Sequence, residues 1–155
     1  MAEYAAVAEQ TVNPGETVVF NVATVPCNRG FVRWRAGSGN FLLSGWVPNK
    51  GGCPCKRAKS ADYFVDVGMN IAVPTGETVG EISVVLSIDG ATDQSTVMTV
   101  TPAAVEEYFN VSRATNVNVW RGCCETVSVR NVSDIPILVQ NANIVFSRPD
   151  LAVTY

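Results

Sequence analysis

Valine outnumbers leucine by 26 to 5 in this chain of 155 residues, and no other feature constrains the fold as strongly. Branching at Cβ restricts the side-chain torsion χ1 and suits the pleated, half-buried surface of a β-sheet, whereas leucine usually leads in helical domains. Nearly half of the residues (47%) are hydrophobic, which is enough for a sizeable core. A chain of this length suits one domain. We therefore expect an all-β protein.

Strand-like segments recur at spacings near ten residues, and turn sequences such as Asn13-Pro14-Gly15 and Asp89-Gly90 separate them. The strand-like segments, some of which can join into one strand or fall outside the sheets, cover 16–22, 31–35, 41–47, 63–73, 81–88, 96–101, 110–112, 116–120, 126–130, 137–140 and 142–147. This pattern predicts an antiparallel β-sandwich or barrel of eight to ten strands. Residues 1–12 are small and polar, so we expect an N-terminal arm there and a single domain over 13–155.

Several classes of function are disfavoured by composition. The chain has no histidine, which excludes a Ser-His-Asp triad, a Cys-His pair and a His-ligated zinc. A net charge of −3 with 11 Lys and Arg argues against nucleic-acid binding, and no apolar run is long enough for a membrane helix. The first residues lack the features of a secretory signal, so we expect synthesis in the cytoplasm.

The order of the segments resembles the trimeric jelly roll of the tumour necrosis factor and complement globular-head superfamily. The resemblance spans about residues 15–148. It is carried by Val18-Val19-Phe20, 31–35, 39–43, 63–73, 82–90, 125–131 and 143–146. It implies a jelly-roll fold and a homotrimer, and it implies no cofactor.

The chain also resembles small proteins encoded by phages and prophages of gut Firmicutes, through residues 26–31, 101–111, 121–124 and 139–143. This likeness implies a virion structural protein, such as a trimeric capsid decoration or accessory protein. Its partner would be the major capsid protein or another virion component, and it would be made in the host cytoplasm. The alternative is a carbohydrate- or receptor-binding head on a phage or bacterial surface, where a host glycan is a possible partner.

Apolar runs such as Val84-Val85-Leu86 break the alternation of inward and outward residues, which implies that both faces of the strand are covered. In a small jelly roll the second cover would be another subunit. Asparagines near these strands could hydrogen-bond around a threefold axis. The expected trimer interface comprises Val84, Leu86, Asn116, Asn118, Asn141 and Asn143.

Five cysteines form two close pairs with one residue left over: Cys27, Cys53, Cys55, Cys123 and Cys124. A one-residue gap and an adjacent pair both suit zinc poorly, so we expect no metal site. Disulfides within or between subunits, and free thiols, both remain open.

A basic loop carries Lys50, Lys56, Arg57 and Lys59. It is either a contact surface for an acidic partner or a solvated face, and we favour the solvated face.

Trp34, Trp46 and Trp120, with Tyr63 and Phe41, either form an aromatic platform for sugars or pack in the core or a subunit interface. We favour packing. The adjacent carboxylates Glu106 and Glu107 diverge on any strand or helix, so they do not form a catalytic pair. The sequence therefore leads us to expect a protein that is not an enzyme.

Overall fold

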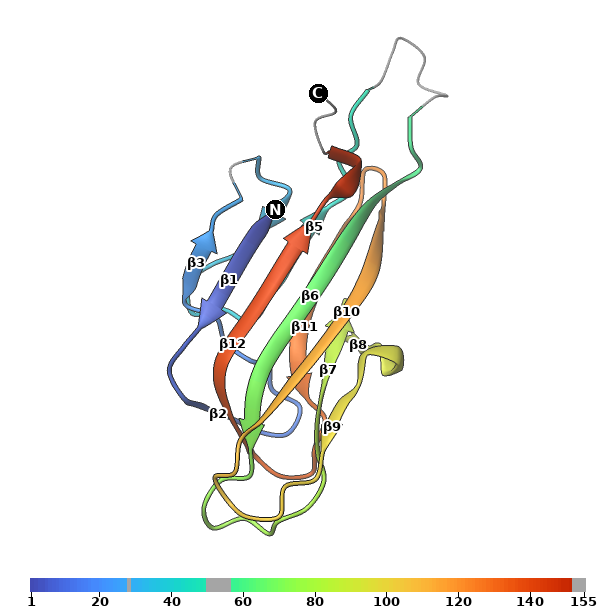
Figure 1. Ribbon diagram of the computed structural model, residues 1–155. Helices are drawn as coiled ribbons and strands as arrows, with labels where there is room; N and C mark the ends of the chain where they lie inside the picture. Colours follow the sequence, from blue (N-terminus) through green and yellow to red (C-terminus); the bar gives the residue numbers. More distant parts are fainter. Residues whose placement is uncertain (28, 50–56, 152–155) are drawn as a thin grey trace.

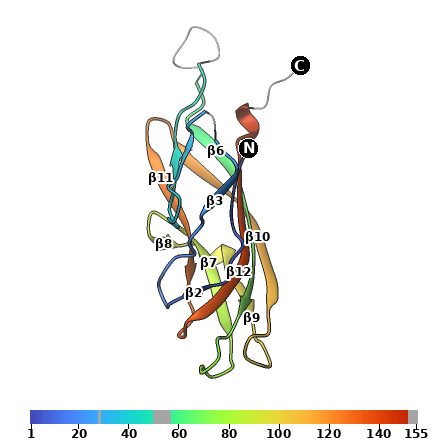
Figure 2. The same cartoon turned by 90° about the vertical axis from the view of Figure 1, so that its left-hand side faces the viewer.

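The computed structural model describes residues 1–27, 29–49 and 57–151. In these residues two antiparallel sheets pack face to face, and their strands run along the long axis of the molecule (Figures 1 and 2). We call them sheet A and sheet B. The prediction of an all-β antiparallel sandwich is confirmed.

Sheet A has the order β10–β6–β12–β1–β3, with β2 paired to β12. Its strands are β1 (Ala2–Ala6), β2 (Gln10–Val12), β3 (Val22–Val25), β6 (Ser60–Ala72), β10 (Phe109–Trp120) and β12 (Ile137–Ser147). β6 shows why the sheet has two different faces: Tyr63, Val65 and Val67 are buried, whereas Phe64 and Asp66 between them are exposed. Successive side chains of a strand point to opposite faces, so the first set lines the core and the second forms the outer face of sheet A.

Sheet B has the order β4–β5–β11–β7–β8, with β9 paired to β7. Its strands are β4 (Val32–Arg33), β5 (Phe41–Ser44), β7 (Ile82–Ile88), β8 (Ala91–Thr92), β9 (Met98–Val100) and β11 (Cys124–Asn131). Two short 3-10 helices, η2 (Gln94–Thr96) and η3 (Pro149–Leu151), complete the elements. The described residues thus hold more strands than the eight to ten expected, because several are only two or three residues long. None of their helices has the length and apolarity to cross a membrane.

Aromatic side chains from both sheets meet in the middle of the core. The ring centroid of Tyr4 lies 4.9 Å from those of Trp34 and Phe41. The Phe41 ring in turn lies 5.0 Å from Phe146 and 5.3 Å from Phe20. Tilted and edge-on pairs at such distances are favourable beyond the area they bury. This cluster fastens sheet B to sheet A.

The N-terminal residues are part of sheet A, which corrects the expected arm over 1–12. β1 pairs with β12 along its whole length and with β3 on its other side. Ala2, Tyr4 and Ala6 are buried, while Glu3 and Ala5 are less so. The sequence of this segment does alternate between buried and less buried positions. Three of its five residues are alanine, whose small side chain gives a weak hydrophobic signal.

Val84 and Leu86 lie in the core of the single chain, which corrects their expected place in a trimer interface. Both side chains are at most 1% exposed and pack in the main hydrophobic cluster. Val85, which points the other way, is also buried. The consecutive apolar residues of β7 are therefore explained by burial of both faces of this strand within the single chain, without another subunit.

The two ends of the sandwich differ in charge. One end, which we call the basic end, comprises residues 29–31, 45–49, 57–59, 120–123 and 147–151. It carries Arg29, Arg57, Lys59, Arg121 and Arg148, and the N-terminus lies beside it (Figure 1). The acidic end comprises residues 7–9, 74–81, 101–108 and 132–136, with six carboxylates and no lysine or arginine.

Candidate binding site at the basic end

Gly45 joins β5 to the turn between β10 and β11. Its N–H donates to the carbonyl oxygen of Cys123 at 2.9 Å, and its own carbonyl accepts from the N–H of Gly122 at 3.4 Å. A Cβ at this position would lie 2.1 Å from the carbonyl oxygen of Trp120. Only glycine allows two backbones to approach this closely. The joint brings Trp46, the next residue, beside the turn formed by residues 120–123.

The tryptophans divide into one core residue and two surface residues. Trp34 stacks on Phe41 and donates from its indole N–H to the carbonyl of Ser38 at 3.1 Å. Trp46 and Trp120 are 57% and 65% exposed. The expected packing thus holds for Trp34, Phe41 and Tyr63, whereas two large aromatic side chains stay in solvent within the single chain.

Two hollows at the basic end are both lined by Trp46. One has a volume of 280 Å³ and is lined by Ser44, Gly45, Trp46, Val47, Arg57, Arg121, Gly122 and Cys123. The other, of 460 Å³, is lined by Arg29, Phe31 and Trp46. Sites for small molecules commonly measure about 300–1,000 Å³, so both are of the order of a small ligand site. Each combines the exposed indole with at least one arginine.

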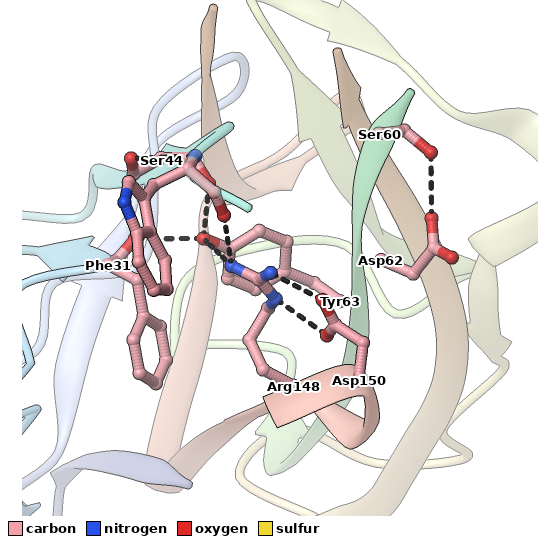
Figure 3. A network of polar contacts seen from close by, with 8 residues as sticks. Phe31, Ser44, Ser60, Asp62, Tyr63, Arg148 and Asp150 are labelled. Carbon is pink, nitrogen blue, oxygen red and sulfur yellow. Dashed lines mark hydrogen bonds and ion pairs between the residues drawn. The ribbon is translucent and has the colours of Figure 1, made fainter. Parts of the chain in front are cut away.

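A buried arginine, Arg148, fixes the backbone of Trp46. Its side chain lies beside Tyr63 and Asp150 (Figure 3). The Nη1 group of Arg148 donates to the carbonyl oxygen of Trp46 at 3.1 Å. Its other nitrogens donate to both carboxylate oxygens of Asp150 at 2.9 and 2.6 Å, and its guanidinium lies 4.9 Å from the centre of the Tyr63 ring. The guanidinium is therefore held on three sides, and Trp46 is positioned by a rigid group.

Tyr63 completes this network from the core side. Its hydroxyl lies 2.5 Å from the carbonyl oxygen of Ser44, to which it donates, and 3.0 Å from that of Phe31. Burial raises the pKa of Tyr63, and the nearby Arg148 opposes that rise. Burial alone would lower the pKa of Arg148, but its hydrogen bonds to Asp150 and Tyr63 outweigh this and raise it. The two side chains thus stay neutral and charged, respectively, well into the alkaline range.

Neither Gly45 nor Arg148 was singled out from the sequence. Gly45 follows a strand, and no local sequence signal indicates that its backbone contacts the turn at residues 120–123, some 75 residues later in the chain. Arg148-Pro149-Asp150 did offer a signal, because a cation and an anion two residues apart follow directly on the last apolar strand.

The structure describes three of the five cysteines, and each has a free thiol. Cys27 is half-buried and lines a hollow of 510 Å³ together with Arg29, Phe31 and Arg148. Cys123 and Cys124 are exposed at the start of β11. Cys53 and Cys55 lie outside the described residues. Within the described part of the chain, no three cysteine or acidic side chains are grouped so that they could hold a metal ion.

The basic loop is described only in part. Arg57 and Lys59 are exposed at the basic end, and the carbonyl of Lys59 accepts from the N–H of Arg121 at 2.9 Å. Arg57 also lines the smaller hollow beside Trp46. Lys50 and Lys56 lie outside the described residues.

Three of the four asparagines expected at a trimer axis share the outer face of sheet A. Asn116 and Asn118 are exposed on β10 between inward-facing valines. Asn143 on β12 donates to the carboxylate of Glu3 at 2.6 Å. Asn141 instead lies in an irregularity of β12 with a φ of 52°. None of the four lines the hollows beside Trp46.

Comparison with known proteins finds similarity in structure but not in sequence families. No protein-family model matches the chain, and no curated protein sequence does. The globular domain of a zebrafish complement 1qA protein aligns with a TM-score of 0.58 at 10% identity, covering 93% of this chain and 94% of that one.

Two further solved structures belong to the same comparison. The Eiger TNF of S. frugiperda gives a TM-score of 0.60 at 12% identity, over 99% of this chain and 93% of its own. Murine APRIL gives 0.50 at 10% identity, over 89% of this chain and 96% of its own. At such low identity the likeness establishes the fold alone. The chain has the jelly-roll fold seen in the globular domains of complement 1q and tumour necrosis factor proteins.

Proposed function

We propose that this protein is a non-enzymatic head module that works as a homotrimer and meets its partner with the basic end. The observation that carries this proposal is the exposure of Trp46 and Trp120 at the same end as Arg57 and Arg121. Tryptophan and arginine are enriched at the energetic centres of binding surfaces. A large indole left in water by the single chain is unfavourable unless a partner covers it.

The outer face of sheet A supports the trimer. One row across its strands carries Ala114, Asp66, Val145 and Glu3, and the next carries Ser112, Gly68, Asn143 and Ala5. Most of these side chains are small, so a second copy could approach the sheet closely. Phe64 projects from the same face and is 40% exposed. The resemblance to trimeric jelly rolls favours three copies over two.

Native mass spectrometry tests the trimer, which we expect at three times 16.6 kDa. Phe64→Asp should yield monomer, because it places a charge on the assembly face. Phe109→Asp is the matched control, since Phe109 is similarly exposed (37%) but occupies an inward-facing register of β10 at its end. A wild-type monomer, or equal dissociation by both variants, would contradict the proposal. Loss of the trimer only on adding reductant would assign it to disulfides between subunits.

We further propose a phage particle as the setting, with the protein as a capsid decoration or accessory protein. The opposite charges of the two ends support this role, because the acidic end can dock on a capsid component while the basic end stays outward. Proteomic analysis of gradient-purified particles from an induced host strain should detect the chain in fixed proportion to the major capsid protein. Its presence only in the particle-free fraction would contradict the proposal.

A further inference from the structure

We propose that the smaller hollow beside Trp46 binds a sugar that carries a carboxylate or a sulfate. The indole of Trp46 would pack against the apolar face of the sugar ring, and Arg57 and Arg121 would contact its anionic group. This inference rests on the proposed binding head and names the ligand class of its basic end.

The indole accounts for the sugar part of the ligand. Trp46 is 57% exposed and lines both hollows, so one face or edge of its ring is open to a ligand. An indole offers a wide, rigid apolar surface with a polar N–H at its edge, which matches a sugar ring with apolar C–H faces and a hydroxylated rim. Gly45, Val47 and Gly122, which also line the hollow, are small and uncharged.

The arginines account for the negative charge. Arg57 and Arg121 line the same hollow, and Arg29 lines the second hollow that Trp46 also lines. Among the described residues, no acidic side chain lines either of them. The nearby Asp150 is engaged by Arg148. Guanidinium groups bind carboxylate and sulfate oxygens through paired, charge-assisted hydrogen bonds, so the hollow favours an anion over a neutral sugar.

The site is already built in the free chain. The Gly45 joint and the bond from Arg148 to the Trp46 carbonyl hold the backbone under the indole. A site that needs little ordering on binding retains more of its interaction energy as affinity. The volume of 280 Å³ suits a short carbohydrate unit rather than an extended polymer.

Three defined sugars test this inference by isothermal titration calorimetry on the full chain. They are 3′-sialyllactose with a carboxylate, a heparin-derived disaccharide with sulfates, and neutral lactose. We expect at least one anionic sugar to bind about tenfold or more tightly than lactose, and its affinity to fall as salt is raised. Binding of sialyllactose alone assigns a carboxylate, of the heparin disaccharide alone a sulfate, and of both a charge-directed site.

Matched variants locate the site. Trp46→Ala and Arg121→Gln should each weaken anionic sugar binding by about tenfold. Both side chains are exposed, and the Trp46 carbonyl that anchors Arg148 belongs to the backbone, so these variants should fold. Phe109→Ala and Arg35→Gln are the controls, because they remove an exposed aromatic ring and an exposed arginine that do not line the hollow. Equal losses in site and control variants would overturn the assignment.

The outcomes separate this inference from the proposed trimer. Equal affinity for lactose, or no binding of any of the three sugars, overturns the inference even when native mass spectrometry finds a trimer. A monomer that binds the anionic sugar through Trp46 and Arg121 supports the inference while the trimer is wrong.

Discussion

At the scale of single residues, three positions decide how the basic end is built. Gly45 allows two backbones to touch, Arg148 anchors the carbonyl of Trp46, and Tyr63 closes the network over Ser44. Arg148 and Tyr63 each donate a hydrogen bond to a backbone carbonyl, and Gly45 exchanges backbone hydrogen bonds with the turn at residues 122–123. The exposed Trp46 therefore sits on a rigid base, which a binding role requires.

Tyr63 should make the fold sensitive to alkaline pH. Its pKa is raised in the folded chain, so the unfolded chain loses its phenolic proton first as the pH rises past about 10. Its contribution to stability is complete below that pH and is lost as the pH climbs through the folded pKa. In urea unfolding, Tyr63→Phe should be less stable at pH 8 and should lose less stability between pH 9.5 and 11.5. Parallel pH curves for the two proteins would contradict this.

At the scale of elements, β10 and β12 are longer and more continuous than local patterns indicate. Residues 110–112 and 116–120 belong to one strand, β10, which pairs with β6 over its whole length. Residues 137–140 and 142–147 likewise form β12, interrupted by an irregularity at Asn141. Polar residues such as asparagine have low β-propensity, so local sequence predicts that a strand ends there. Hydrogen bonds to a long neighbouring strand keep these residues in the sheet. β1 is the clearest case, because two partners convert an apparent arm into a central strand.

The role of β1 is testable with adjacent residues on its two faces. Tyr4→Ala should lower the free energy of unfolding by about 3 kcal/mol or more, because it empties a site in the aromatic cluster. Glu3→Ala should lower it by less than about 1.5 kcal/mol, since only a hydrogen bond to Asn143 is lost. Thermal or urea unfolding measures both. Two equally small effects would mean that residues 1–6 act as an arm after all.

At the scale of the whole molecule, the sandwich separates the outer face of sheet A, a basic end and an acidic end. No lysine or arginine occurs between Lys59 and Arg113, and this stretch supplies β6, β7 and two of the four segments of the acidic end, 74–81 and 101–108. The charge asymmetry therefore arises from the chain path. It orients the molecule in the field of any charged partner. One end can dock while the other binds.

Val84→Asp distinguishes a core residue from an interface residue at this scale. Because Val84 is fully buried within one chain, the variant should be unfolded or aggregated by circular dichroism. Val79→Asp is the control, since Val79 is 38% exposed at the acidic end, and it should remain folded. If the Val84→Asp variant were folded and monomeric, Val84 would belong to a subunit interface and not to the core.

The sequence by itself determined the fold class, because the preference of β-branched residues for strands and the alternation of apolar and polar residues are local properties. Both can be recognised without knowing which strands pair. It also excluded histidine chemistry outright. It could not determine which apolar residues face another subunit, since Val84 and Val85 are both buried within the single chain. Nor could it separate Trp34 from Trp46 and Trp120, because all three lie in strand-like segments. Only the tertiary structure decided that two indoles stay in water beside arginines, because exposure depends on which strands pack above each face.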